Sequence, residues 1–115
     1  MKMVIAYIQP FTADQVVKAL QAIPQVVGAT LTECQGFGRG RGSVEAEPLA
    51  TEKDRFGTLR KMRVESMIPD NLEETVVQAI RTAAYTGRNG DGKIYVTSIH
   101  RAVRIRTGQE GEAGL

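Results

Sequence analysis

The strongest constraint on the fold is a strand–proline–helix unit that occurs twice in the chain. Residues 2–8 are rich in strand-forming residues and end at Pro10, and residues 59–68 alternate apolar and polar side chains up to Pro69. After each proline, apolar residues recur at i, i+3, i+4 and i+7, the pattern of a helix with one buried side. The other expected elements are strands at 27–35 and 93–99.

The resulting β-α-β-β-α-β order predicts an α+β, ferredoxin-like sandwich made of two right-handed split β-α-β units. Both helices then cover one face of a four-stranded sheet. The other face is expected to stay bare and to carry valine, isoleucine and tyrosine side chains, which favours burial in a homo-oligomer. The length of 115 residues predicts a single domain spanning 1–115.

The helix starts carry capping-box signals. Thr12 is followed three residues later by Gln15, and Asp70 is followed three residues later by Glu73. In such a box the first side chain bonds a backbone N–H of the first turn. We therefore expect Thr12 and Asp70 to cap the two helices.

Composition excludes several classes of protein. The formal net charge of +2 gives no general attraction to nucleic acid or membranes. Cys34 is the single cysteine, which rules out an intramolecular disulfide, and His100 is the single histidine, which leaves little for a metal site. The apolar run before Pro10 is too short for a signal peptide, and no segment reaches membrane-spanning length. These features predict a cytoplasmic location.

A glycine-rich loop, 86–93, ends in Lys93 directly before the last expected strand. Glycines let backbone N–H groups approach an anion, and lysine supplies charge. The segment Gly87–Lys93 fits the first seven positions of the P-loop pattern, but Ile94 follows instead of serine or threonine. A helix also precedes the loop and a strand follows it, the reverse of a P-loop. This loop is therefore an anion-site candidate outside that class.

Two other elements are able to bind anions. The long connection from Gly36 to Gly57 begins with glycines and arginines, and its middle is acidic, so its root is expected to contact a ligand and its tip a partner. In an extended segment at 101–106, Arg104 and Arg106 would leave one face about 7 Å apart. Each element alone is also compatible with a solvated turn or edge. Together they indicate a polyphosphate ligand.

These motifs resemble those of the PII signal-transduction proteins over nearly the whole chain. The similarity is strongest from Pro69 to the C-terminus. The motifs that carry it are Pro10-Phe11, Thr30-Leu31-Thr32-Glu33, Gly36-Phe37-Gly38-Arg39, Thr86-Gly87, Gly90-Asp91-Gly92-Lys93-Ile94 and Arg101-Ala102-Val103-Arg104-Ile105-Arg106-Thr107-Gly108.

The resemblance implies a homotrimer of ferredoxin-like subunits that binds ATP or ADP in the clefts between neighbours, with AMP as a further candidate. It implies a T-loop at about 37–58, a B-loop at about 85–93 and a C-terminal loop at about 104–115. The T-loop would change conformation with the nucleotide and dock on an enzyme, transporter or regulator. The implied nucleotide-binding residues are Gly28, Thr30, Gly36, Phe37, Gly38, Arg39, Glu65, Gly90, Asp91, Gly92 and Lys93, with Arg104 and Arg106 coming from the adjacent subunit.

Departures from the family pattern concern a second effector. Gly40 stands where nitrogen-regulatory members carry a glutamine that helps bind magnesium and 2-oxoglutarate, whereas Lys61 matches a lysine that contacts 2-oxoglutarate. The residues expected around a second effector are Gly40, Arg41 and Lys61. No tyrosine falls within the T-loop, so uridylylation there is not expected. Gln9 stands where members of the family commonly carry a lysine before Pro10.

These departures favour a PII-like regulator of carbon or nitrogen metabolism outside the standard nitrogen branch, with bicarbonate or 2-oxoglutarate as the second effector. The alternative is a standard nitrogen-regulatory PII protein that responds to ATP and 2-oxoglutarate. No protein target is identified by the loop tip.

An enzyme and an RNA-binding module are weaker alternatives. The same topology occurs in acylphosphatases, but here the candidate anion loop precedes the last strand instead of following the first. No nucleophile–histidine pair or carboxylate pair suggests catalysis, so no catalytic or metal-binding residue is predicted. With three phenylalanines and three tyrosines, the strands lack the aromatic platform that stacks RNA bases.

Overall fold

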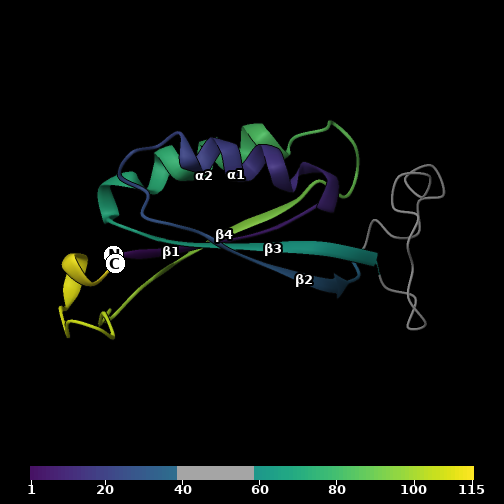
Figure 1. The fold of residues 1–115 in the computed structure, drawn as a ribbon. Helices are drawn as coiled ribbons and strands as arrows, with labels where there is room; N and C mark the ends of the chain where they lie inside the picture. The colour runs from purple at the N-terminus through teal and green to yellow at the C-terminus, as the bar shows by residue number, and fades with distance from the viewer. Residues whose placement is uncertain (39–58) are drawn as a thin grey trace.

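The computed structural model describes residues 1–38 and 59–115, which form a four-stranded antiparallel sheet with two helices on one face (Figure 1). The order across the sheet is β2-β3-β1-β4, with the two strand–helix units interleaved at its centre. The predicted ferredoxin-like α+β architecture is confirmed. The strands are β1 (Lys2–Ile8), β2 (Thr30–Gly36), β3 (Leu59–Ile68) and β4 (Gly92–Ser98).

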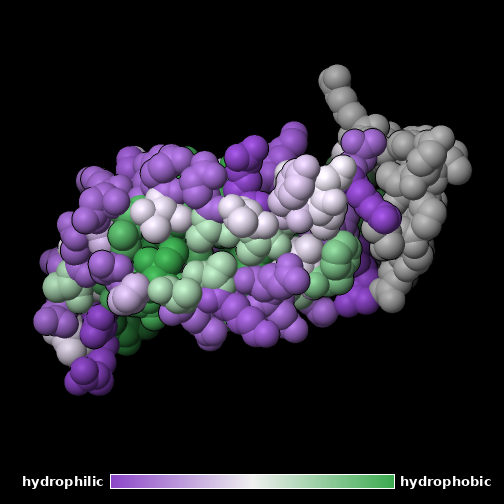
Figure 2. Space-filling model, turned by 90° about the horizontal axis from the view of Figure 1, so that it is seen from above, coloured by the Kyte–Doolittle hydropathy of each residue, from purple (hydrophilic) through white to green (hydrophobic). Residues whose placement is uncertain are grey.

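The helices α1 (Ala13–Gln21) and α2 (Glu73–Ala84) each bury one stripe of side chains against the sheet. Their outward sides are polar, and from the helix side hydrophilic residues dominate the surface around a narrower apolar band (Figure 2). Burial of the apolar stripe supplies most of the stability of such short helices. The buried apolar core comprises Val4, Ala6, Ile8, Ala13, Val16, Leu20, Val64, Ile68, Leu72, Val76, Ile80 and Ala84.

The predicted capping boxes are wrong. A 3₁₀ turn precedes each helix, Pro10–Thr12 before α1 and Asp70–Leu72 before α2, and neither cap position makes a side-chain cap hydrogen bond. The Thr12 hydroxyl instead donates to the carbonyl oxygen of Gln9 at 2.8 Å. The turn therefore satisfies the Thr12 side chain before the helix begins.

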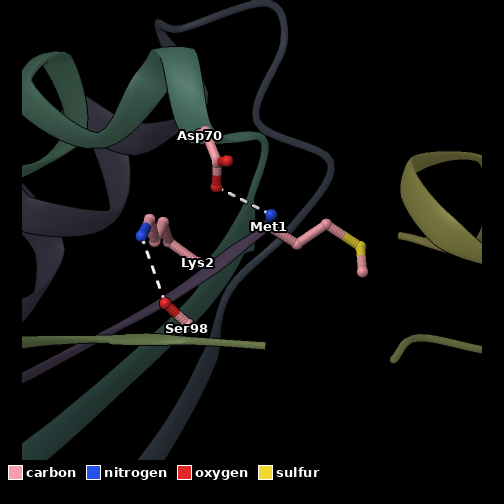
Figure 3. A network of polar contacts seen from close by, with 4 residues as sticks. All are labelled: Met1, Lys2, Asp70 and Ser98. Atoms are coloured by element: carbon pink, nitrogen blue, oxygen red, sulfur yellow. Dashed lines mark hydrogen bonds and ion pairs between the residues drawn. The ribbon is translucent and has the colours of Figure 1, made fainter. Parts of the chain in front are cut away.

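Asp70 binds the start of the chain instead of the start of α2 (Figure 3). Its Oδ1 accepts a hydrogen bond from the Met1 ammonium at 2.7 Å, an ion pair between residues 69 positions apart in sequence. The hydrogen bond from this ammonium is the main cause that lowers the pKa of the Asp70 carboxyl below its usual value. Beside it, Lys2 Nζ donates to Ser98 Oγ at 3.2 Å, which ties β1 to β4.

Asp70→Asn is expected to lower the melting temperature slightly at pH 7 and not at low pH. The folded-state pKa of Asp70 is depressed, so its contribution to stability is present above the unfolded pKa of about 3.9 and is lost as the pH falls through the folded value. Thermal unfolding of both proteins from pH 7 down to about pH 3 tests this. Asp14→Asn, in the first turn of α1, is the matched control. An equal difference at every pH would contradict the prediction.

The face of the sheet opposite the helices is less apolar than expected. Isoleucine and tyrosine lie there as predicted, but the valines of the central strands, Val4 and Val64, are buried under the helices. The exposed face carries Arg63, whose Nε lies 2.6 Å from Glu65 Oε1 and whose guanidinium carbon lies 5.7 Å from the centre of the Tyr7 ring. A neighbour on the open side of the sheet would therefore contact this mixed surface and not the two helices.

The extended segment predicted at 101–106 is wrong. A bridge pairs Val103 with Glu110, and the chain turns between them at 105–107. Gly108 and Gly111 adopt φ values of +73° and +70°, which close this hairpin. Arg104 and Arg106 therefore do not lie two apart on one strand face.

Candidate functional site

The glycine-rich loop, the root of the long connection and the end of β1 meet at one end of the sheet. Ile8 is opposite Gly92 of β4 on one side and Met62 of β3 on the other, and Gly36 is opposite Leu59. Residues 85–91 and the described ends of β2 and β3 therefore lie at the same end of the sheet (Figure 1). This juxtaposition of predicted elements, which are far apart in sequence, defines the candidate site.

The loop between α2 and β4 is closed by the carboxylate of Asp91. Its Oδ2 accepts the N–H groups of Thr86 at 2.8 Å and Gly87 at 3.1 Å, and its Oδ1 accepts the Thr86 hydroxyl. The Thr86 hydroxyl oxygen in turn accepts the N–H of Arg88 at 3.2 Å. Burial raises the pKa of Asp91, but these hydrogen bonds and the Lys61 charge outweigh it and hold the pKa below its usual value.

A second set of contacts holds the other side of the loop. The carbonyl oxygen of Gly90 accepts hydrogen bonds from Gln9 Nε2 at 2.7 Å and from Lys61 Nζ at 3.2 Å. Gln9 is buried at the end of β1, and Lys61 lies near the start of β3. The loop is thus fixed to both central strands of the sheet.

Lys61 is a half-buried cation at this end of the sheet. Burial is the main cause that lowers the pKa of its ammonium, and the nearby Asp91 carboxylate and Cys34 oppose the shift. The Cys34 Sγ lies 3.6 Å from the carbonyl oxygen of Lys61. A partly desolvated ammonium whose hydrogen-bond partner is a neutral carbonyl is suited to an anionic ligand.

Gly28, Thr30 and Glu65 lie further along the sheet. The carbonyl oxygen of Gly28 accepts a hydrogen bond from Ser66 Oγ at 2.7 Å, and Thr30 is opposite Glu65. Glu65 and Lys61 are four residues apart on β3, so they share a face and are separated by about 13 Å.

Arg104 and Arg106 are remote from the loop within one chain. The N–H of Ile99 bonds the carbonyl of Met1 at 2.9 Å, so the chain enters the C-terminal hairpin at the start of β1, opposite the end where Gly92 meets Ile8. The two ends of β1 are about 20 Å apart. Arg104 instead donates to the Leu115 carbonyl oxygen at 2.7 Å.

Comparison with known proteins places these features in a family. The model of the family described as "Nitrogen regulatory protein P-II" matches residues 1–109. The chain belongs to the nitrogen regulatory protein P-II family. It is 47% identical to a nitrogen regulatory protein P-II of Bradyrhizobium diazoefficiens over 96% of both chains. It is 41% identical to nitrogen regulatory protein P-II 1 of Escherichia coli K12 over 100% of both chains. The predicted family and its role in signal regulation are confirmed.

The structure brings part of the site residues predicted from the resemblance to the P-II family to one end of the sheet. Gly90, Asp91, Gly92 and Lys93 lie together in the loop and the start of β4, near the Lys61 ammonium. Gly36, Phe37 and Gly38 follow at the end of β2, where Phe37 is exposed. The predictions for Arg39, Gly40 and Arg41 fall outside the described residues.

Two contributors to this site escaped the sequence analysis. Gln9 was noted as a departure from the P-II pattern, but its bond to Gly90 joins residues 81 positions apart. Thr86 was part of the motif, but its pairing with Asp91 depends on the folded loop. An acid five residues after a threonine in a glycine-rich loop is the local signal for the second contact, whereas no local signal exists for the first.

Within residues 1–38 and 59–115, no three potential metal-ligating side chains are grouped. In the same part of the chain, no helix is both long and apolar enough to cross a membrane.

Proposed function

We propose that this P-II protein is a homotrimeric, cytoplasmic regulator that binds ATP or ADP in clefts between subunits. Nucleotide would set the conformation of the T-loop at about 37–58, and that loop would control a partner enzyme or transporter. In this proposal residues 1–115 act as one domain without catalytic function, and the B-loop at about 85–93 and the C-terminal loop at about 104–115 face each other across the cleft.

The observation that carries the proposal is the separation of the basic elements in one chain. Lys93 is the second residue of β4, at one end of the sheet, and Arg104 lies in the C-terminal hairpin beyond the other end of β4. One chain therefore does not surround a polyphosphate. Cyclic, head-to-tail assembly brings one end of a subunit against the opposite end of its neighbour and would close the site.

The proposed roles follow the chemistry of each group. The glycine loop and Lys93 would hold phosphates from one subunit, and Arg104 and Arg106 would hold them from the next. Gly28, Thr30 and Glu65 would flank the adenosine. Gly36, Phe37, Gly38 and Arg39 would report on the phosphates at the root of the T-loop.

The second effector separates two versions of this function. Relatives that are 41–47% identical over nearly their whole length are named nitrogen regulatory proteins, which supports the version that responds to ATP and 2-oxoglutarate. The half-buried Lys61 ammonium supports an anionic effector at the same end of the sheet. Gly40 supplies no side-chain ligand atoms, which supports the version outside the standard nitrogen branch, with bicarbonate as effector.

Calorimetric titration with ATP, ADP and AMP, each with and without 2-oxoglutarate or bicarbonate, tests the proposal. We expect nucleotide binding with a dissociation constant in the micromolar range, which corresponds to a binding free energy of about −8 kcal/mol. Tighter ATP binding in the presence of 2-oxoglutarate assigns the nitrogen version, and coupling to bicarbonate assigns the carbon version. Absence of binding by all three nucleotides would show that the basic elements are a solvated surface.

A further inference from the structure

A carboxylate is an unexpected group in a loop that is proposed to hold phosphates. At short range a free Asp91 carboxylate would repel a phosphate group and weaken binding. Two arrangements avoid this cost. The carboxylate could hold a cation that also contacts the phosphates, or it could be satisfied by hydrogen-bond donors of its own loop.

The contacts of Asp91 favour the second arrangement. Oδ2 accepts two backbone N–H groups, from Thr86 at 2.8 Å and Gly87 at 3.1 Å, and Oδ1 accepts the Thr86 hydroxyl. Both oxygens are therefore directed into the loop. No cluster of metal-ligating side chains includes Asp91 among the described residues.

These hydrogen bonds also determine which N–H groups stay available. The side chains of Thr86 and Asp91 form a hydrogen-bonded ring with the backbone. The N–H groups of Thr86, Gly87 and Arg88 donate within this ring. The N–H groups of Asn89 and Gly90 have no hydrogen-bond partner in the described part of the chain. They lie in the turn just before Lys93, so the ring presents free donors next to a free cation.

The opposite side of the turn is immobilised as well. The Gly90 carbonyl oxygen accepts hydrogen bonds from Gln9 and Lys61, at 2.7 and 3.2 Å. Because this carbonyl is held toward the sheet, the backbone of the turn is fixed between the sheet and the hydrogen-bonded ring of Thr86 and Asp91. A preorganised set of donors binds an anion without paying to order the loop at the moment of binding.

We propose that Asp91 is a positioning residue that acts through Thr86 and does not touch the nucleotide. The inference rests on the proposed function, because it assigns the loop to the phosphates. Asp91 shapes the loop, and the Asn89 and Gly90 N–H groups together with Lys93 make the contacts with the phosphates.

The test measures ADP affinity by calorimetry on the full chain, once with excess chelator and once with Mg²⁺. Asp91→Asn replaces one acceptor oxygen by a donor, Thr86→Val removes the hydroxyl, and Thr86→Ser keeps it. We expect Asp91→Asn and Thr86→Val each to weaken ADP binding about tenfold, equally with and without Mg²⁺. Thr86→Ser is expected to keep the wild-type ADP affinity. The double variant Thr86→Val/Asp91→Asn is expected to bind ADP no more weakly than Asp91→Asn, because both changes break the same hydrogen-bonded ring.

Three results would overturn the inference. A loss of ADP affinity in Asp91→Asn that occurs in the presence of Mg²⁺ and not in the presence of chelator would make Asp91 a cation ligand. If Thr86→Val binds ADP with normal affinity and Asp91→Asn binds it weakly, the Asp91 side chain contacts the nucleotide directly. Tighter binding by Asp91→Asn would mean that a free negative charge had been removed from the site. If Asp91→Asn does not fold, judged by circular dichroism and size, the Thr86→Val and Thr86→Ser pair decides alone.

Failure of the proposed function gives a different result. If the wild-type protein does not bind ADP, the function is wrong, but the ring remains testable by amide hydrogen exchange. The N–H groups of Thr86 and Gly87 are expected to exchange slowly in the wild type and at least about tenfold faster in Asp91→Asn. Equal exchange in both proteins would refute the ring, whatever the nucleotide result.

Discussion

Gly92→Ala is expected to lower the free energy of unfolding by roughly 3 kcal/mol or more. Gly92 begins β4 with a φ of +115°, a conformation that L side chains rarely adopt. An added Cβ would lie 1.8 Å from the carbonyl oxygen of Tyr7 and 2.9 Å from its carbonyl carbon. Both are backbone atoms of the central strand β1, so they cannot move aside like the end of a flexible side chain.

Thermal unfolding of Gly92→Ala measures this effect, which corresponds to a drop in melting temperature of more than about 10 °C for a domain of this size. Gly36→Ala is the matched control, because Gly36 is also a terminal strand residue at the same end of the sheet, its φ is not positive and a Cβ there would meet nothing within 4 Å. The control is expected to stay within about 0.5 kcal/mol of the wild type. Equal stability of the two variants would contradict the close approach of β4 to β1.

Most of the fold could be predicted from the sequence because apolar periodicity reports burial directly. The spacing of Val16 and Leu20 in α1, and of Val76 and Ile80 in α2, marks the residues that are buried under the sheet. The predicted strand boundaries lie within three residues of those observed, with the largest difference at the start of β2, where Thr30 replaces residue 27.

The role of Asp70 before α2 could not be predicted, because its partner lies far away in sequence. Asp70 has the residue type and spacing of a cap, but the Met1 ammonium competes for its carboxylate from 69 positions away. A charged donor forms a stronger hydrogen bond to a carboxylate than a backbone N–H does. The hairpin around Arg104 was missed for a different reason, because Val103 pairs locally with Glu110 and the chain turns between them.

The candidate site was predicted in its composition and not in its internal contacts. Glycines and cations in the loop before β4 indicate an anion site without any knowledge of the fold. The ring that joins Thr86 to Asp91 exists only once the loop is closed, and the bond from Gln9 to Gly90 only once the sheet is formed. Residue type therefore predicts an anionic ligand, and only the fold shows which side chains contact one another in the loop.

Lys93→Ala and Arg104→Ala are each expected to weaken ADP binding by roughly 1–3 kcal/mol, the range for hydrogen bonds to charged groups. Both side chains are exposed and neither is part of the buried core, so the fold and the oligomeric state should not change. Calorimetry on each purified variant measures the loss. Wild-type affinity in both would refute the proposed pocket.

Mixing the two variants distinguishes a site between subunits from a site within one chain. Lys93 and the C-terminal hairpin are at opposite ends of a sheet that is about 20 Å long at β1, so in the proposed trimer the two residues of one chain would belong to different clefts. In a cyclic trimer that contains both variants, a Lys93→Ala subunit retains Arg104 and an Arg104→Ala subunit retains Lys93. One cleft of every mixed trimer then combines both wild-type side chains.

Co-expressed, differently tagged variants purified through both tags should therefore bind ADP with wild-type affinity at one site per trimer. Homotrimers of each variant, co-expressed in both tagged forms and purified through both tags, are the control and should bind weakly at every site. Recovery of high affinity in the mixture requires that the two residues meet across a subunit boundary, because no chain in the mixture contains both. Uniformly weak binding by the mixed trimers would contradict a site between subunits and would indicate that the Lys93 and Arg104 that act together belong to one chain.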